Sequence, residues 1–95
     1  MSIRETRIKN KILDYLNSLP GCKAEKRHGS QYSEAGAPDI NACYKGRSIQ
    51  IEVKRPEKKP TPIQLKRLRE WQEAGAVVGW VTDLEDVKRM LEELE

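Results

Sequence analysis

Two short segments of alternating apolar and polar residues, 39–44 and 49–54, flank a stretch that contains Lys45 and Gly46. Alternation with a period of two residues is typical of a β-strand with one buried face. Glycine accepts the positive φ that a two-residue hairpin loop requires, so the sequence predicts an antiparallel hairpin that turns at these two residues. This hairpin constrains the fold more than any other feature, because its turn decides which residues of the two strands face each other.

A two-residue loop pairs Tyr44 with Arg47, and the same register places Asp39 opposite Glu52. Opposed residues have Cβ atoms roughly 5 Å apart, and like charges so close destabilise a sheet unless a positive charge lies between them. Side chains alternate across a strand, so Lys54 shares the face of both acids, and the apolar residues share the other. We therefore expect one face to carry chemistry, with a divalent cation between the acids, and the other to pack the core.

The chemistry that suits this cluster is metal-assisted attack of water on a phosphodiester. Two carboxylates bind Mg²⁺ incompletely and leave its other positions to water and phosphate oxygens. The ion would polarise the phosphate and acidify the attacking water, while Lys54 positions that water or stabilises charge in the transition state. Whether Lys54 is also the general base stays open.

A purely structural interpretation exists for the same residues. Asp39 can cap the turn after Pro38, and Glu52 and Lys54 can form an ion pair on the solvated face of a one-sided sheet. For an isolated Glu-x-Lys pattern this interpretation is the better one. The complete pattern favours a site, because the turn alone sets the register that brings the acids of two separate motifs together.

The remaining segments predict helices on either side of the hairpin and one further strand. A helix that starts near Ile3 ends at Pro20 and Gly21, and another begins with Thr61 as N-cap and Pro62 at its first position. The expected elements are a helix at 3–19, strands at 22–27, 39–44 and 49–54, a helix at 62–74, a strand at 76–81 and a helix at 83–94. This order, αβββαβα, predicts the α/β class with a central mixed β-sheet flanked by helices.

The length of 95 residues, 37% of them hydrophobic, fits a single domain, residues 1–95, with a thin core. No secretion-type segment follows Met1, and no apolar run approaches the roughly 20 residues that cross a bilayer. We therefore expect a cytoplasmic protein with reduced thiols. Cys22, Cys43 and His28 are irregularly spaced and fall short of a closed zinc site, so we treat them as incidental.

Charge is unevenly distributed around a net value of +3. The segment 54–69 is strongly basic, and the segment 83–95 is acidic. Most such runs are ordinary solvated surface. A cationic patch on one side of a small domain also suits a polyanion such as DNA.

These residues resemble the PD-(D/E)XK nuclease superfamily and, within it, the small VRR-NUC domain found as free-standing phage and bacterial proteins and at the end of the Fanconi-associated nuclease. The resemblance covers nearly the whole chain and implies a PD-(D/E)XK nuclease-like αβββαβα fold. It rests on Glu5 in the first helix, Gly36-x-Pro38-Asp39, Ile51-Glu52-Val53-Lys54, Gln64 in the following helix and the strand AGAVVGWV.

The resemblance also implies a role for each residue of the site. Mg²⁺ would be held by two side chains and one main-chain carbonyl, and Mn²⁺ would be able to replace it. The implied metal ligands are Asp39, Glu52 and the Val53 carbonyl, and the implied catalytic residues are Glu5, Asp39, Glu52, Lys54 and Gln64.

Glu5 and Gln64 have structural alternatives. Glu5 lies at the N-terminal end of the buried helix stripe, where a carboxylate favours the helix dipole. Thr61-x-x-Gln64 is also a capping box, in which Gln64 reaches back to the Thr61 N–H. The resemblance favours an active-site role for both Glu5 and Gln64. Gln64 can alternate between capping the helix and contacting the active site.

Basic residues that follow the site are candidates for binding backbone phosphates, although solubility alone explains some of them. They are Lys58, Lys59, Lys66, Arg67 and Arg69. The loop 29–35 precedes Asp39 and offers Tyr32 for stacking on a base. Trp71 and Trp80 occupy periodic apolar positions and are expected in the core or in an interface.

The resemblance implies a homodimer that cuts branched DNA, as Holliday-junction resolvases do. Flaps, forks and duplex DNA remain alternative substrates, because the residues do not separate them. A catalytically silent DNA-binding module with the same fold is the alternative from another functional class. A restriction-type enzyme fits less well, since the chain has no room for a recognition domain.

Overall fold

The elements of the chain follow the order predicted from the sequence. The computed structural model describes residues 3–28 and 34–94. Its elements are α1 (Ile3–Ser18), β1 (Cys22–Lys26), β2 (Ile40–Tyr44), β3 (Arg47–Val53), α2 (Pro62–Glu73), β4 (Val77–Val81) and α3 (Leu84–Glu92). The αβββαβα order and the α/β class are therefore confirmed. No described helix has the length and apolar character needed to span a membrane.

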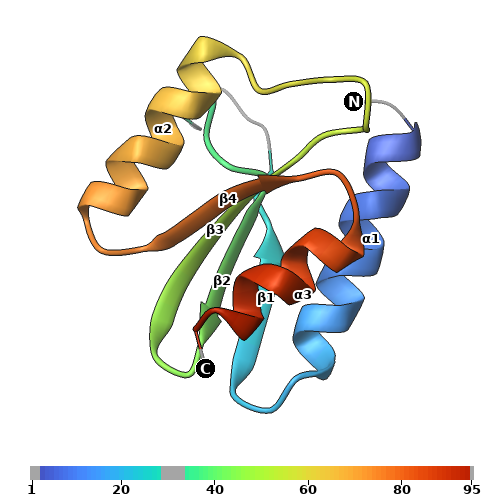
Figure 1. Cartoon of the computed structure of the whole chain (residues 1–95), viewed down its shortest axis with the longest axis vertical. Helices are drawn as coiled ribbons and strands as arrows, with labels where there is room; N and C mark the ends of the chain where they lie inside the picture. The colour runs from blue at the N-terminus through green and yellow to red at the C-terminus, as the bar shows by residue number, and fades with distance from the viewer. Residues whose placement is uncertain (1–2, 29–33, 95) are drawn as a thin grey trace.

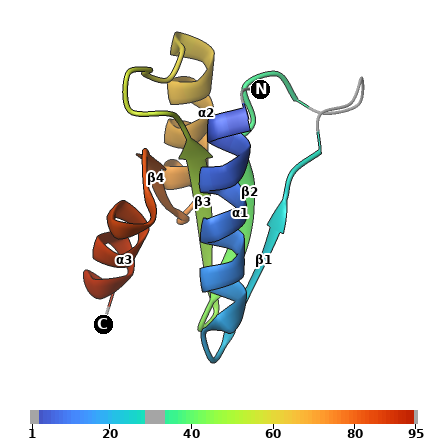
Figure 2. The same cartoon turned by 90° about the vertical axis from the view of Figure 1, so that its right-hand side faces the viewer.

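The strands form one four-stranded sheet with the order β1-β2-β3-β4 (Figure 1). β1, β2 and β3 are antiparallel neighbours, whereas β4 pairs with β3 in parallel because the chain crosses over through α2 between them. α1 and α3 lie on one face of the sheet and α2 on the other (Figures 1 and 2). The sheet is thus mixed and covered by helices on both faces, as predicted.

The hairpin between β2 and β3 has the predicted turn and register. Lys45 has φ 49° and Gly46 has φ 85°, which are the positive values of a tight two-residue turn. Tyr44 pairs with Arg47, and the pairing continues without a bulge to the other end of β2. One further step of this register brings Asp39, which directly precedes β2, opposite Glu52.

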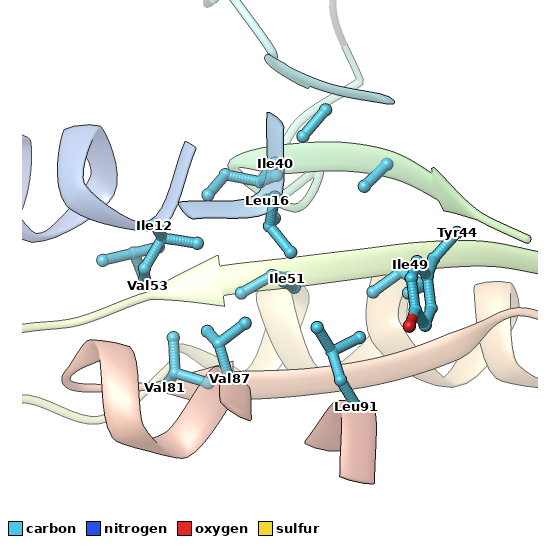
Figure 3. Packing of buried hydrophobic residues seen from close by; sticks show 12 residues of the cluster. Ile12, Leu16, Ile40, Tyr44, Ile49, Ile51, Val53, Val81, Val87 and Leu91 are labelled. Atoms are coloured by element: carbon cyan, nitrogen blue, oxygen red, sulfur yellow. The ribbon is translucent and has the colours of Figure 1, made fainter. Parts of the chain in front are cut away.

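α1 and α3 pack against the apolar face of the hairpin (Figure 3). Ile12 and Leu16 of α1 and Val87 and Leu91 of α3 point towards β3, where Ile51 is completely buried. A spacing of four residues keeps each pair on one side of its helix. The rest of the buried cluster consists of Ala24, Ile40, Ala42, Tyr44, Ile49, Val53 and Val81.

The other face of β3 is polar and yet buried. Gln50 is fully buried; it donates to Asn41 Oδ1 at 2.7 Å and accepts from Arg27 at 2.9 Å. Arg27 also donates to the Pro38 carbonyl at 2.7 Å, and its guanidinium lies over the Trp71 ring. Buried polar groups need such partners, and this network connects α2 to the strands beneath it.

α2 packs mainly against β4, at the edge of the sheet. The apolar residues of α2 at helical spacing are Leu65, Leu68, Trp71 and, at its C-cap, Ala74, but of these only Leu68 is buried, and Leu65 is 37% exposed. A helix over a sheet edge has fewer neighbours than one over the centre, which explains the narrower buried face. Trp80 of β4 is 42% exposed, so its expected core position is wrong, and an interface role stays a prediction.

The described part of the loop before Asp39, residues 34–38, is held against the start of α2. Gly36 has φ 79°, and a Cβ there would lie 3.0 Å from Ile63 Cγ1 and 3.1 Å from the Ile63 carbonyl. Arg67 donates to the Ala35 carbonyl at 3.0 Å and forms an ion pair with Glu34 at 3.0 Å. The Gly36-x-Pro38-Asp39 motif therefore needs glycine for two reasons, backbone conformation and close packing.

Gly36→Ala is expected to destabilise the chain more than Gly46→Ala. Both glycines have positive φ, which costs another residue roughly 1–2 kcal/mol, but a Cβ at Gly46 meets no atom within 4 Å. Alanine at Gly36 also collides with the backbone of Ile63. Urea unfolding of the two variants would measure this difference, and equal losses would show that the loop does not depend on its contact with α2.

Candidate active site

The start of β2 and the end of β3, next to which Asp39 and Glu52 are found, lie at the end of the sheet where α1 and α2 begin (Figure 1). Asp39 directly precedes β2, and Glu52 is the penultimate residue of β3. Lys54 follows β3, and its N–H donates to the Val81 carbonyl at 2.9 Å, which extends the contact between β3 and β4. The hairpin and the parallel strand thus bring the three predicted residues to one corner of the sheet.

The Asp39 carboxylate is held on both oxygens. Oδ2 accepts a hydrogen bond from the Val53 N–H at 2.9 Å. Oδ1 lies 3.5 Å from the ammonium nitrogen of Lys9, a residue of α1 that is only 3% exposed. A buried cation is strongly favoured to pair with an acid, so α1 contributes directly to the orientation of Asp39.

The Glu52 carboxylate is almost completely buried, with 2% exposure. Its Oε2 lies 3.6 Å from the Lys54 ammonium nitrogen. Its Oε1 is buried and has no hydrogen-bond donor among the described residues. A buried carboxylate oxygen without a donor is costly, and such an atom in a native fold calls for a proton or a cation.

Burial, and after it the nearby charge of Asp39, raise the pKa of Glu52 from its ordinary 4.5 to about 8, while Lys54 opposes the shift. Glu52 is therefore largely protonated at neutral pH when no cation is bound. A divalent ion that replaces this proton would favour the ionised form.

Lys9 is a residue of this corner that was not predicted from the sequence. It follows Glu5 by four positions and precedes Ile12 by three, so it lies on the stripe of α1 that turns towards the sheet. The sequence signal that could have identified Lys9 was its position on the buried stripe of the helix, because a buried lysine needs an acid nearby. Glu5 is half-buried one turn earlier on the same side of α1, and its role in the site stays a prediction.

The two carboxylates fit a hard divalent ion that keeps several water ligands. They are oxygen donors, as Mg²⁺ prefers, and Glu52 Oε1 has no protein donor to lose among the described residues. No group of three or more His, Cys, Asp or Glu side chains that could hold a metal occurs in residues 3–28 and 34–94. Cys22 pairs with Tyr44, and Cys43 pairs with Lys23. Because successive residues of a strand point to opposite faces, the two cysteine side chains lie on opposite faces of the sheet and do not face a common ligand.

Gln64 forms the capping box that its spacing from Thr61 predicts. Its Oε1 accepts from the Thr61 N–H at 2.9 Å, and its own N–H donates to Thr61 Oγ1 at 3.3 Å. The structural alternative is therefore formed in this conformation. Its contact with the active site stays a prediction that requires the box to open.

The basic residues after the site fall into two groups. Arg67 binds the Ala35 carbonyl, Glu34 and Glu70 within the protein, so its proposed contact with DNA has to compete with these partners. The other group is exposed and consists of Lys58, Lys59, Lys66 and Arg69.

Tyr32, predicted to stack on a base, lies outside the described residues.

Comparisons with known proteins agree with this geometry. One solved structure, a "VRR_NUC domain", has a TM-score of 0.81 and 26% sequence identity and covers 99% of this chain and 100% of its own. The chain has the architecture of a VRR-NUC domain. A second structure, a "VRR_NUC domain protein", shares the fold with a TM-score of 0.72 at 14% identity and covers 98% of this chain and 88% of its own. No protein-family model matches the sequence, and a search of curated proteins finds no match.

The VRR-NUC likeness confirms the resemblance stated from the sequence and supports a nuclease-type domain. The residues of this VRR-NUC-like chain that form the corner of the sheet are those of the predicted motifs, with Lys9 added from α1. The likeness extends to the fold and to the nuclease class, and the role of each residue stays a prediction.

Glu52→Gln is expected to stabilise the metal-free chain at pH 9 but hardly at pH 5. Because the folded-state pKa of Glu52 lies above its ordinary value, folding stability falls as pH rises from 4.5 to about 8. The neutral amide avoids that loss, and a gain of at least about 1 kcal/mol corresponds to roughly 4–8 °C in the unfolding temperature. Thermal unfolding in EDTA at both pH values measures it. The same shift at pH 5 and pH 9 would contradict the buried, proton-binding state of Glu52.

Proposed function

We propose that the chain is a Mg²⁺-dependent DNA endonuclease that hydrolyses phosphodiester bonds. The observation that carries this proposal is the Asp39 and Glu52 pair, in which one buried carboxylate oxygen lacks a donor among the described residues. Like charges on directly opposed residues destabilise a sheet, so the pair calls for positive charge between its carboxylates. The likeness to VRR-NUC structures supports the nuclease class.

Each residue of the corner has a part in the proposed mechanism. Asp39, Glu52 and the Val53 carbonyl would hold Mg²⁺, which supplies Lewis acidity and a more acidic water. The Val53 N–H keeps Asp39 turned towards Glu52. Lys54, whose side chain is only 15% exposed, is close enough to position the attacking water or to stabilise negative charge on the phosphate.

The proposed substrate is DNA, with branched DNA as the preferred form. Lys58, Lys59, Lys66 and Arg69 are exposed in the segment after the site, where they can bind backbone phosphates on either side of the bond that is cut. A homodimer would place two sites on one branched molecule. The exposed Trp80 at the sheet edge provides apolar surface for such pairing.

A catalytically silent DNA-binding module is the second candidate. It is favoured by one observation, the presence of two ammonium groups beside the two carboxylates. Lys9 and Lys54 place a positive charge beside each of the two carboxyl groups without any metal ion. The chain could therefore keep this corner for stability alone, and cleavage must be measured to separate the two functions.

The wild-type chain is expected to cleave labelled four-way junction DNA in Mg²⁺, and Glu52→Ala is expected to lose cleavage by at least about 100-fold because the ion loses a ligand. Binding of the same DNA in Ca²⁺ should persist in the variant. Binding by the wild type without cleavage in Mg²⁺ or Mn²⁺ would instead support the silent module.

A panel of junction, flap, fork and linear duplex substrates at low salt then identifies the preferred DNA. Low salt is needed because phosphate-driven binding weakens steeply as salt rises. Equal cleavage of all four forms would reject a preference for branched DNA. Cleavage of duplex at one defined sequence would point to a restriction-type enzyme.

Lys54→Ala is expected to bind Mn²⁺ nearly as well as the wild type but to lose turnover by at least about 100-fold, because Lys54 acts on the water or the phosphate and not on the ion. Calorimetric titration with Mn²⁺ measures the affinity, with Asp39→Ala as the reference for a lost ligand. An equal loss of affinity in the two variants would mean that Lys54 belongs to the metal site.

A further inference from the structure

Lys9 is a buried cation at the site that the proposed mechanism does not use. It comes from α1, whereas Lys54 comes from the end of β3, and each approaches a different acid. Lys9 lies 3.5 Å from Asp39 Oδ1, and Lys54 lies 3.6 Å from Glu52 Oε2. The two carboxylates therefore already face two positive charges.

The position of Lys9 is fixed by its surroundings. The residue is only 3% exposed, and the helix that carries it is anchored in the core by Ile12 and Leu16, which have no exposed surface. A lysine on the buried side of a helix that is anchored in the core has little freedom to withdraw its ammonium group into water. Lys54 differs, because it follows the last residue of β3 and keeps 15% of its side chain exposed.

The arrangement of donors around the four carboxylate oxygens is uneven. Asp39 Oδ2 accepts from the Val53 N–H, and Oδ1 faces Lys9. On Glu52, Oε2 faces Lys54, and Oε1 alone has no donor within the described chain. The carboxylate oxygen left for an added cation is therefore on Glu52, while Asp39 Oδ1 already faces a positive charge.

A site for two divalent ions needs more carboxylate than this corner offers. Two-metal sites place their ions about 3.5–4 Å apart and share acids between them. Among the residues described, no third His, Cys, Asp or Glu side chain joins Asp39 and Glu52 in a group that could hold a metal. A second divalent ion at Asp39 would also face the buried ammonium of Lys9, and such repulsion is strong away from bulk water.

We infer that Lys9 is a positioning residue whose ammonium group orients Asp39 and takes the place of a second divalent ion at that carboxylate, so that the site binds one ion per chain. This inference rests on the proposed metal-dependent function and adds the stoichiometry of the site. It assigns to α1 a role in the chemistry through Asp39, without contact between Lys9 and the substrate.

The test begins with Mn²⁺ titrations of the whole chain at pH 8, monitored by calorimetry and by the electron paramagnetic resonance of unbound Mn²⁺. The wild type is expected to bind one ion per chain. Lys9→Met keeps the length of the side chain and removes its charge, so Mn²⁺ should bind at least about threefold more tightly, with a second ion at higher concentration. Lys9→Arg should restore wild-type binding. Lys11→Met, an exposed position on the same helix, is the matched control and should change nothing.

Stability provides a second measurement. If Mn²⁺ replaces the missing charge, the ion should raise the unfolding temperature of Lys9→Met more than that of the wild type. A purely structural role of Lys9 would lower the unfolding temperature in EDTA without increasing the response to Mn²⁺. If Lys9→Met does not fold, Lys9→Gln serves for the same comparison, and the wild-type stoichiometry tests the inference without any variant.

The outcomes separate the inference from the function on which it rests. Two Mn²⁺ ions of similar affinity in the wild type, or a loss of affinity in Lys9→Met as large as in Asp39→Ala, would overturn the role of Lys9 and leave the nuclease proposal intact. No Mn²⁺ binding by the wild type would overturn the metal site and the inference together.

Discussion

The structure depends on two acids that the hairpin forces to face each other. The turn at Lys45 and Gly46 sets a register that is hard to change, because a shift of one residue would turn Ile51 to the polar face and Gln50 and Glu52 into the apolar core. Asp39 and Glu52 are therefore held together by the same contacts that build the core. The cost of this arrangement appears in the raised pKa of Glu52 and in its buried oxygen without a donor in the described chain.

Much of the fold and the central pair could be predicted from the sequence, because both depend on local rules. Alternation and a glycine turn define the hairpin, and caps define the helix that begins after Thr61. The register then follows by counting residues from the turn, so the facing positions of Asp39 and Glu52 are a direct consequence of the residue order. Residue roles, the ion and the preferred DNA are different, since they depend on a substrate that the fold does not contain.

The features that the sequence did not reveal depend on how distant elements pack. Lys9 contacts Asp39 because α1 packs against the end of the hairpin that carries this acid. Since lysine is charged, the sequence pattern did not indicate that Lys9 would be buried. Gln50 is fully buried because Arg27 and Asn41 satisfy it, and these partners come from two other segments. The exposure of Leu65 arises because α2 lies over the edge strand. Periodicity identifies which side of a helix faces the protein, but it does not show how many residues of that side the neighbouring sheet buries.

Arg27 gives this small chain a mechanical connection between its two halves. Its guanidinium joins the Pro38 carbonyl, one peptide before Asp39, to the ring of Trp71 on α2. The helix that carries Lys66 and Arg69 on its outside is thus coupled on its inside to the peptide that leads into the acid. A displacement of α2 would therefore reach the peptide before Asp39 through a single side chain, by one cation–π contact and one hydrogen bond.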